Sequence, residues 1–523
     1  MRLRLTGAAL GAAAVALSSQ LALAGPGVRV PRYSVFEQTL RFTTAASNPW
    51  EQVKADVTLA GPNGRAVSVG GFYAGGSTWK FRFAPWSLGR WSWTARLSDR
   101  AHAVTRHGGF VVVPGGHGFV RQSPYDRYRW AFSDGRPYDP IGLQDCTVRR
   151  YTDNPLTGLG FDGGEGTPRW TSLEPYLTAY AAAGFSLFRW GPNNCSFGLY
   201  DLIAPSGNVY SQQGGAYADE LIAALRRHGF RVEFVLFGPQ PPFPGGSQNQ
   251  AEMTAVERYV RYVVDRYGAS VDFWELMNEA TVSTGWYTNI AGYLRQIDPY
   301  RHPIGTNWSR PDLPGMDFGT DHWYETEPDV DTDLVAWRHL RGEEARRLGK
   351  PTLVDEQGNA GHNWDATSAV RMRLRAWTAF FAEAALVFWN TSDTKDYRAD
   401  TGNIYLGPEE RGYIRVLADY MRGFDPRARV VSASVSGSPG LRAYALRGPS
   451  EYGLYLVDGA SHAVPVTGAR VVVDPAHAGR AVWIDPATGR TLATRRVPAG
   501  RQTLVVPSFT TDVAVRICSE ARG

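Results

Sequence analysis

The sequence has few cysteines and no spacing of cysteine and histidine that suits a metal. Three cysteines in 523 residues are too few for a disulfide framework. Cys146 and Cys195 could pair, which would leave Cys518 alone, or all could be separate thiols. These features argue against a disulfide-rich fold. We expect no zinc site and no cofactor.

Long apolar runs and dense basic runs are also missing. Beyond the N-terminus, no apolar stretch reaches the roughly 20 residues that a membrane-spanning helix needs. The arginines are scattered, so 55 Lys and Arg against 50 Asp and Glu form no basic run. We therefore expect no transmembrane segment and no nucleic acid partner. The oligomeric state is left open by the sequence.

The N-terminus has the three parts of an export signal. Arg2 and Arg4 form a basic end, Leu10–Leu17 an apolar run, and Ala22-Leu23-Ala24 a cleavage site of small residues. The apolar run is too short for a membrane anchor. We predict that residues 1–24 are a signal peptide and that the mature protein is secreted or periplasmic.

Short segments of alternating apolar and polar residues follow the signal. Val53–Leu59 is one example, and turn residues recur about every ten positions. A period of two with frequent turns is typical of antiparallel sheets. We predict an N-terminal β-sandwich over residues 30–116. The alternation returns near the C-terminus and predicts a second β-sandwich over residues 426–523.

Between these regions, strand-like runs alternate with helical stretches. The predicted strands are Tyr138–Leu143, Phe185–Trp190, Val232–Phe237, Val271–Met277, Pro303–Thr306, Gly319–Tyr324, Thr352–Glu356 and Ala385–Asn390. The predicted helices are Leu173–Ala183, Tyr217–His228, Ala251–Tyr267, Tyr287–Ile297, Leu334–Leu348, Ser368–Glu383 and Glu409–Arg422. Pro303–Thr306 has no obvious long helix after it. This α/β pattern predicts a (β/α)8 TIM barrel over residues 117–425.

Two predicted strands of the barrel end in a glutamate. Glu279 follows Asn278 at the end of the fourth strand, and Glu356 ends the seventh. The C-terminal ends of barrel strands form the active site, so the two side chains can converge there. Cleavage of a glycosidic bond needs two such carboxyl groups, one to donate a proton and one to attack or stabilise the anomeric carbon. The alternative is that either glutamate is an exposed loop carboxylate.

Asn278 and Glu279 are neighbours, and successive side chains of a strand point to opposite faces. Both can reach the site only if the strand bulges or ends there. His322 and Tyr324 are two residues apart and so share a face of the sixth strand. A tyrosine hydroxyl or a nearby guanidinium, such as that of Arg189 at the end of the second strand, would stabilise an ionised Glu356.

Aromatic side chains at the barrel mouth are possible platforms for a sugar ring. Trp389 ends the eighth strand, where a ring can contact a bound sugar. Other tryptophans could equally pack in the core or in loops; they are Trp190, Trp308, Trp323 and Trp364. Of these tryptophans, we include only Trp389 among the predicted substrate-binding residues.

Taken together, Trp274–Glu279, His322, Tyr324, Glu356 and Trp389 resemble the pattern of glycoside hydrolase clan A, and most closely the family 5 cellulase-like enzymes. The resemblance implies that Glu279 is the acid/base and Glu356 the nucleophile. It also implies substrate-binding or positioning roles, which fall on Arg189, Asn278, His322 and Tyr324. The flanking regions resemble the small sandwiches found before and after such barrels in bacterial hydrolases.

Two features depart from the clan's pattern. The acid/base motif of the clan usually reads Asn-Glu-Pro, whereas Ala280 follows Glu279 here. A glycine-rich segment, Gly158–Gly166, follows the first predicted strand. Its Asp162 and Glu165 could reach a substrate, or the segment could be a solvated loop. Because of these departures, the resemblance predicts the fold and the chemistry but not a particular sugar.

The sequence thus predicts a secreted retaining glycoside hydrolase that acts on a carbohydrate by double displacement. Resemblance to the clan implies β-D-pyranosides or stereochemical equivalents, with equatorial leaving groups. One alternative is a carbohydrate-binding protein that keeps the scaffold without turnover. The other is a transglycosylase, which would use the same residues. The sequence does not define the sugar, the linkage, or endo against exo action.

Overall fold

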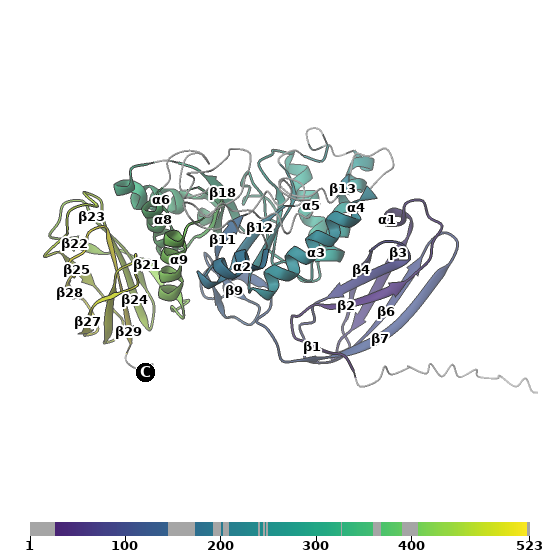
Figure 1. Ribbon diagram of the computed structural model, residues 1–523, viewed down its shortest axis with the longest axis horizontal. Coiled ribbons are helices and arrows are strands. Elements are labelled where there is room, and N and C mark those ends of the chain that lie inside the picture. The colour runs from purple at the N-terminus through teal and green to yellow at the C-terminus, as the bar shows by residue number, and fades with distance from the viewer. Residues whose placement is uncertain are drawn as a thin grey trace, which may run out of the picture.

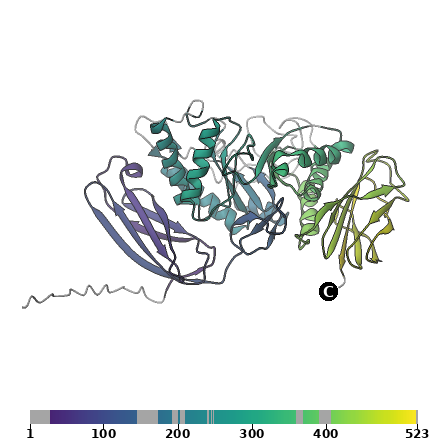
Figure 2. The same ribbon diagram turned by 180° about the vertical axis from the view of Figure 1, so that it is seen from behind.

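A computed structural model describes most of the chain between residues 27 and 519. The segments outside the described residues are 1–26, 145–172, 192–199, 202–208, 239–240, 244–245, 247–248, 326, 359–367, 390–405 and 520–523. The described chain is elongated, with β-sheets at both ends and a mixed α/β region between them (Figures 1 and 2). The predicted signal peptide lies outside the described residues, as do Cys146, Cys195, Asp162, Glu165 and Trp364.

The N-terminal region is a seven-stranded sheet in the order β1-β7-β6-β3-β4-β5-β2. Its strands are β1 (Arg29–Pro31), β2 (Phe36–Arg41), β3 (Lys54–Ala60), β4 (Ala66–Tyr73), β5 (Thr78–Phe83), β6 (Gly89–Ser98) and β7 (Ala103–Val113), with the short helix α1 (Pro49–Gln52) between β2 and β3. Buried and exposed residues alternate along β6, as the sequence pattern predicts. Trp91, Trp93, Ala95 and Leu97 on its buried face enter one hydrophobic cluster.

Eight parallel strands form the central sheet in the order β17-β16-β15-β12-β11-β20-β19-β18. Their bounds are β11 (Ile141–Gln144), β12 (Leu187–Trp190), β15 (Arg231–Phe237), β16 (Phe273–Met277), β17 (Ile304–Gly305), β18 (Gly319–Trp323), β19 (Thr352–Gln357) and β20 (Ala385–Phe388). Nearly every residue of these strands is buried, as expected for parallel strands that are covered by helices. The predicted α/β class and a nearly closed parallel barrel of eight strands are confirmed.

The ring is open between its fifth and sixth strands. β17 and β18 are the two ends of the sheet order and are not paired as strands. Separate hydrogen bonds bridge them: the Asp317 N–H donates to the Ile304 carbonyl at 2.8 Å, the Ile304 N–H donates to Asp317 Oδ2 at 2.7 Å, and the Thr320 hydroxyl donates to the Thr306 carbonyl at 2.6 Å. We call this junction the β17/β18 seam.

Helices cover the outside of the barrel (Figure 1). They are α2 (Leu173–Ala182), α3 (Gln212–Arg227), α4 (Gln250–Tyr267), α5 (Thr284–Ile297), α6 (Thr332–Gly342), α7 (Glu344–Arg347), α8 (Ala369–Ala382) and α9 (Pro408–Met421). In α4, the side chain of Asn249 accepts a hydrogen bond from the Glu252 N–H at the helix start. Its buried residues, among them Val256, Val260 and Val263, recur at a helical spacing, so that one face packs against the barrel. None of the described helices has both the length and the apolar character needed to cross a membrane.

Two predicted elements differ from the structure. The predicted strand Tyr138–Leu143 is split, because Pro137–Tyr138 forms β10 and only Ile141–Gln144 enters the barrel. β10 pairs with β9 (Trp130–Phe132), which pairs with β8 (Val120–Gln122). Pro140 lies at the break, where it has no N–H to give to a ladder. The predicted helix Leu334–Leu348 is likewise divided into α6 and α7.

The C-terminal region has two antiparallel sheets, ordered β21-β23-β24-β29-β26-β27 and β22-β25-β28. The bounds are β21 (Arg429–Val431), β22 (Ser434–Ser436), β23 (Leu441–Arg447), β24 (Glu451–Asp458), β25 (Arg470–Val473), β26 (Gly479–Ile484), β27 (Thr491–Val497), β28 (Gln502–Val505) and β29 (Asp512–Ser519). Residues of both sheets enter one hydrophobic cluster. The remaining short elements are β13 (Tyr200–Asp201), β14 (Val209–Tyr210) and the 3-10 helix η2 (Asp329–Asp331). The predicted sandwich domains and their boundaries stay predictions.

Candidate active site

Glu356 lies near the C-terminal end of β19 and is held by three hydrogen-bond donors. Arg189 Nη1 contacts its Oε1 at 2.6 Å, Gln144 Nε2 donates to the same oxygen at 3.0 Å, and the Tyr324 hydroxyl donates to Oε2. Burial alone would raise the pKa of Glu356, but the neighbouring His322 and Arg189, with the bonds from Tyr324 and Gln144, lower it overall. The site therefore stabilises the ionised form of this buried carboxyl group.

Glu279 has a different environment. β16 ends at Met277, and Glu279 adopts a left-handed backbone with φ of 48° two residues later. The end of the strand removes the alternation that would point Asn278 and Glu279 to opposite faces. The Glu279 side chain is 37% exposed, and Oε1 lies 2.8 Å from Nδ1 of His322. One carboxyl group of the pair is thus open to solvent while the other is enclosed.

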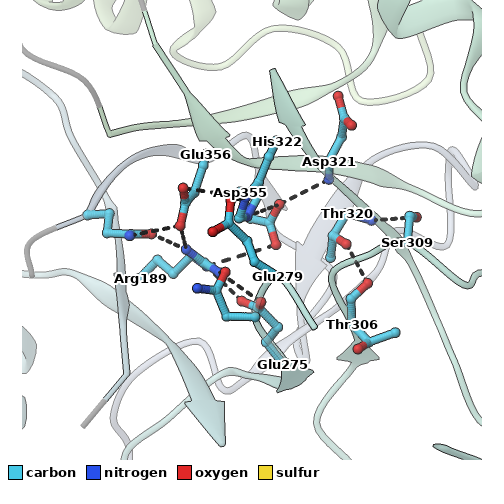
Figure 3. Close-up of polar contacts among 12 residues, drawn as sticks. Arg189, Glu275, Glu279, Thr306, Ser309, Thr320, Asp321, His322, Asp355 and Glu356 are labelled. Carbon is cyan, nitrogen blue, oxygen red and sulfur yellow. Dashed lines mark hydrogen bonds and ion pairs between the residues drawn. The ribbon is translucent and has the colours of Figure 1, made fainter. Parts of the chain in front are cut away.

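His322 connects the two glutamates. Its Nδ1 is 2.8 Å from Glu279 Oε1 and 3.4 Å from Glu356 Oε2. The pairing of β18 with β19 shifts register between Asp321 and His322, and such a bulge re-aims the side chains that follow it. One oxygen from each glutamate and one nitrogen of His322 all lie within 4.8 Å of one another. Figure 3 shows these three side chains meeting at one point of the barrel mouth.

Arg189 lies beneath this pair and is almost completely buried on β12. Its guanidinium makes a two-pronged ion pair with Glu275, with distances of 2.6 and 2.7 Å, and donates to Asn278 Oδ1 at 2.9 Å. The remaining donor reaches Glu356 and Gln144. Burial lowers the pKa of Arg189, but the charges of Glu275 and Glu356 outweigh this and raise it well above its ordinary value. Arg189 is therefore a permanent cation between two carboxylates (Figure 3).

Four buried residues of the site were not predicted from the sequence. Gln144 contacts Glu356, Glu275 anchors Arg189, and Glu233 and Asp355 lie deeper in the barrel. A signal for three of them was present, since an acidic residue inside an apolar strand is rarely exposed in a barrel and must have a role there. Gln144 had no such signal, because a polar residue at a strand end is ordinary.

The tryptophans fall into two groups. Trp190 and Trp323 are buried in the core, as the alternative of core packing predicts. Trp389 is half-buried, and its backbone N–H donates to the Gln357 carbonyl at 3.1 Å, which places it beside β19 at the barrel mouth. Trp308 is 50% exposed, and its ring centre lies 5.9 Å from that of His322. It therefore flanks the site beside His322.

Within the part of the chain that the structure describes, three groups of carboxylate or histidine side chains come close enough to share a cation. They are Glu279–His322–Glu356, Asp321–His339–Glu343 and Glu233–Glu275–Asp355. In the first two, the histidine already contacts a carboxylate, at 2.8 and 2.5 Å respectively. In the third, Glu275 is engaged by Arg189. Contacts among the side chains explain the first two groups, whereas in the third both oxygens of Glu233 are buried without a hydrogen-bond partner.

Comparison with known sequences identifies one small part of the chain. Residues 29–98 match a family described as a domain of unknown function, DUF5060. No curated protein sequence matches the chain. The family match covers only the N-terminal sheet and does not extend to the barrel.

Solved structures show the fold of nearly the whole chain. A presumed glycoside hydrolase from Bacteroides vulgatus has a TM-score of 0.64 at 16% identity, and the alignment covers 94% of this chain and 99% of that one. A GH30 endoxylanase from Clostridium papyrosolvens has a TM-score of 0.42 at 13% identity, covering 73% and 97%. An endo-β-1,4-mannanase from Thermotoga petrophila has 0.40 at 13%, covering 62% and 95%. The structural neighbours are glycoside hydrolases, and the fold of this chain is glycosidase-like.

Proposed function

We propose that this protein is a retaining glycoside hydrolase in which Glu279 is the acid/base and Glu356 the nucleophile. The observation that carries the proposal is that two carboxyl groups have oxygens within 4.8 Å of each other but differ in environment, since Glu356 is enclosed and Glu279 is exposed to solvent. Retention needs carboxyl groups about 5–5.5 Å apart, whereas inversion needs about 6.5–9.5 Å to fit a water molecule. One oxygen of each group within 4.8 Å of the other brings the two groups close enough for direct attack by one carboxylate, and the stereochemical test below separates retention from inversion.

The environments support the assignment of roles. A nucleophile must be ionised, and the lowered pKa of Glu356 with its three donors favours that form. A general acid must exchange protons with the leaving group and later with water, and the exposed Glu279 has that access. Arg189, Tyr324 and Gln144 hold Glu356, while His322 holds Glu279.

The mechanism follows from these positions. Glu279 gives its proton to the glycosidic oxygen while a carboxylate oxygen of Glu356 bonds to the anomeric carbon, and the leaving group departs as an alcohol. Glu279, now ionised, takes a proton from a water molecule, which attacks the same carbon and releases Glu356. The two inversions give net retention. Asn278, His322, Tyr324 and Trp389 are proposed to contact the substrate.

The substrate is proposed as a glycoside with an equatorial leaving group, on the resemblance to the clan. A screen of aryl glycosides and of plant, algal and bacterial polysaccharides with the purified protein tests the activity. NMR of the first-formed anomer tests the stereochemistry, and an inverted product would contradict the role of Glu356. Added acceptor sugars separate hydrolysis from transglycosylation. Binding without turnover would identify a carbohydrate-binding protein instead.

Export of the protein is proposed as well. Residues 1–24 have the three parts of a signal peptide, so the mature chain is expected to begin near Gly25. N-terminal sequencing of the protein recovered from the periplasm or medium of an expressing bacterium tests this. An intact Met1 in the recovered protein would contradict it.

A further inference from the structure

The barrel interior beneath the catalytic pair contains more carboxyl groups than its cations can neutralise. Glu233, Glu275, Asp355 and Glu356 are all buried, on strands β15, β16 and β19. Arg189 offsets Glu275 by a two-pronged pair and also contacts Glu356. Ionised carboxylates are costly to bury without a partner. The Arg189 guanidinium is thus shared by Glu275, Glu356 and, at 3.9 Å, Asp355, and among the described residues Glu233 has no ion pair.

Glu233 and Asp355 also have fewer hydrogen-bond partners than Glu275 and Glu356. Both oxygens of Glu233 and Oδ2 of Asp355 are buried without a hydrogen-bond partner, whereas Asp355 Oδ1 accepts from the Asp321 N–H at 3.0 Å. One oxygen from each of Glu233, Glu275 and Asp355 falls within 4.8 Å of the others. Carboxyl groups this close in a dry interior cannot all ionise. Burial and the charge of Glu275 raise the pKa of both Glu233 and Asp355 well above the ordinary range.

His322 has one side on the catalytic groups and the other on Asp355. Nδ1 lies 2.8 Å from Glu279 and 3.4 Å from Glu356, so a proton on this nitrogen would lie between two carboxyl groups that can accept it. Nε2 has no hydrogen-bond partner and lies 3.7 Å from Asp355 Oδ1, beyond an ordinary hydrogen bond but within reach of a small adjustment. The state of Nε2 decides which tautomer or charge the ring adopts.

We propose, on the basis of the proposed function, that Asp355 is an uncharged positioning residue that engages Nε2 of His322. This contact keeps the Nδ1–H of His322 directed at the two catalytic carboxyl groups. A neutral carboxylic acid suits this position, because it can donate to an unprotonated Nε2 or accept from a protonated one. An ionised Asp355 would instead add a negative charge next to Glu356 and oppose its ionisation. The groups that face Asp355 are Arg189, Glu233, Glu275, His322 and Glu356.

The fixed ring has a chemical consequence for Glu279. When Nδ1–H donates to Oε1, that oxygen is occupied as an acceptor, and the acidic proton of Glu279 is left on Oε2. This oxygen is then free to face the leaving group. If the ring turned over or changed tautomer, the proton of Glu279 would be held by the imidazole instead. Asp355 thus acts on proton donation without touching the substrate.

A comparison of two substitutions at Asp355 tests the proposal. Asp355→Asn keeps an uncharged group of the same shape that can donate or accept, while Asp355→Leu keeps only the approximate size. With substrates whose leaving groups need a proton, we expect Asp355→Leu to lower kcat at least about tenfold more than Asp355→Asn does, since acid catalysis contributes about 10²–10⁴-fold in all. With activated aryl leaving groups the two variants should be nearly equal. Thermal unfolding of both variants shows whether each is folded.

A spectroscopic measurement tests the ring itself. In protein labelled with ¹⁵N-histidine, the His322 signals, assigned by their loss in His322→Gln, should report a protonated Nδ1 in the wild type and in Asp355→Asn. They should report a changed tautomer population in Asp355→Leu. Asp321→Asn is a matched control. The Asp321 side chain contacts His339 and not the His322 imidazole, so this substitution should leave the His322 signals in place.

The outcomes separate this proposal from the proposed function. Equal losses in Asp355→Asn and Asp355→Leu, or no difference between poor and activated leaving groups, would overturn the uncharged positioning role. So would an unprotonated Nδ1 in the wild type. If no glycoside is cleaved but the ¹⁵N signals behave as expected, the proposed function fails while the arrangement of Asp355 and His322 stands.

Discussion

The two glutamates at the barrel mouth are held in opposite ways. The side chain of Glu356 is 5% exposed and receives hydrogen bonds from three elements, β11, β12 and the end of β18. The side chain of Glu279 is 37% exposed, has one histidine contact, and follows a backbone turned into the left-handed region. The position of the Glu356 carboxyl group is thus fixed by several donors, whereas that of Glu279 is fixed by His322.

This difference corresponds to the demands of the proposed reaction. A nucleophile gains from a rigid, ionised state that changes little before bond formation. An acid/base must be protonated in one step and ionised in the next, and many fixed donors would prevent that. Asymmetric support of two identical side chains therefore gives them different roles, and the predictions below test that asymmetry.

Removal of the enclosed carboxyl group should have the largest effect. Glu356→Gly is expected to lower kcat/KM by at least about 10⁴-fold on every glycoside that the wild type cleaves, since covalent catalysis is lost. Steady-state rates with poor and activated leaving groups measure this. The isosteric Glu356→Gln should fail equally, which separates loss of charge from loss of volume. Residual turnover that depends on the leaving group would contradict the role of Glu356.

Removal of the exposed carboxyl group should have a smaller and selective effect. Glu279→Ala is expected to lower kcat about 10²–10⁴-fold with leaving groups that need a proton and much less with activated ones. Azide, as a small anionic nucleophile, should accelerate the second step and yield a glycosyl azide of retained configuration. Product analysis by NMR checks this. If azide rescues Glu356→Gly and not Glu279→Ala, the two assignments must be exchanged.

Loss of one donor to Glu356 should shift the pH profile. Glu356 acts when ionised, so kcat/KM falls as pH falls through its lowered pKa. Tyr324→Phe removes a hydrogen bond to the ionised form and therefore raises that pKa. We expect the acidic limb of kcat/KM to move about one unit to higher pH. Tyr125→Phe, on an exposed tyrosine, is the matched control. An unmoved or oppositely moved limb would show that Tyr324 does not stabilise the carboxylate.

The smallest effect should come from the backbone beside Glu279. A residue before proline is driven toward extended backbone, which conflicts with the φ of 48° at Glu279. Ala280→Pro, which introduces the Asn-Glu-Pro motif of the clan that the sequence resembles, is thus expected to misplace the carboxyl group and lower kcat about tenfold with poor leaving groups. Ala280→Ser keeps the backbone free and serves as its control. Equal or higher activity in Ala280→Pro would show that the left-handed turn is dispensable.

The sequence predicts the order of elements well because the pattern is local. Apolar runs and helical spacing lie within a few residues, and the alternation of strands and helices in the barrel was predicted from them. The differences are the separate strand Pro137–Tyr138 and the division of α6 from α7. The break at Pro140 depends on pairing with β9, a contact that no local window contains. Glu279 and Glu356 were found because strand ends of a barrel converge.

The interior polar layer could not be predicted in the same way. Glu233, Glu275 and Asp355 each read locally as one acidic residue in an apolar run. Their meaning depends on which strands are neighbours around the ring and on Arg189, which joins them from β12. The bulge that turns His322 toward Glu279 likewise results from the pairing of β18 with β19. Sequence supplies the members of the site, and tertiary geometry supplies their partners.

The β17/β18 seam is a place where the barrel can open locally. A ring joined throughout by strand ladders opens only when several bonds break together, but β17 and β18 share no strand ladder and are joined instead by separate hydrogen bonds, among them those between Asp317 and Ile304 and between Thr320 and Thr306. Amide hydrogens at this junction should exchange with solvent sooner than those of the central strands, because local opening there needs less free energy. Trp308 follows β17, and His322 belongs to β18. Opening of the seam would therefore change the distance between Trp308 and His322, on the side of the mouth where Glu279 lies.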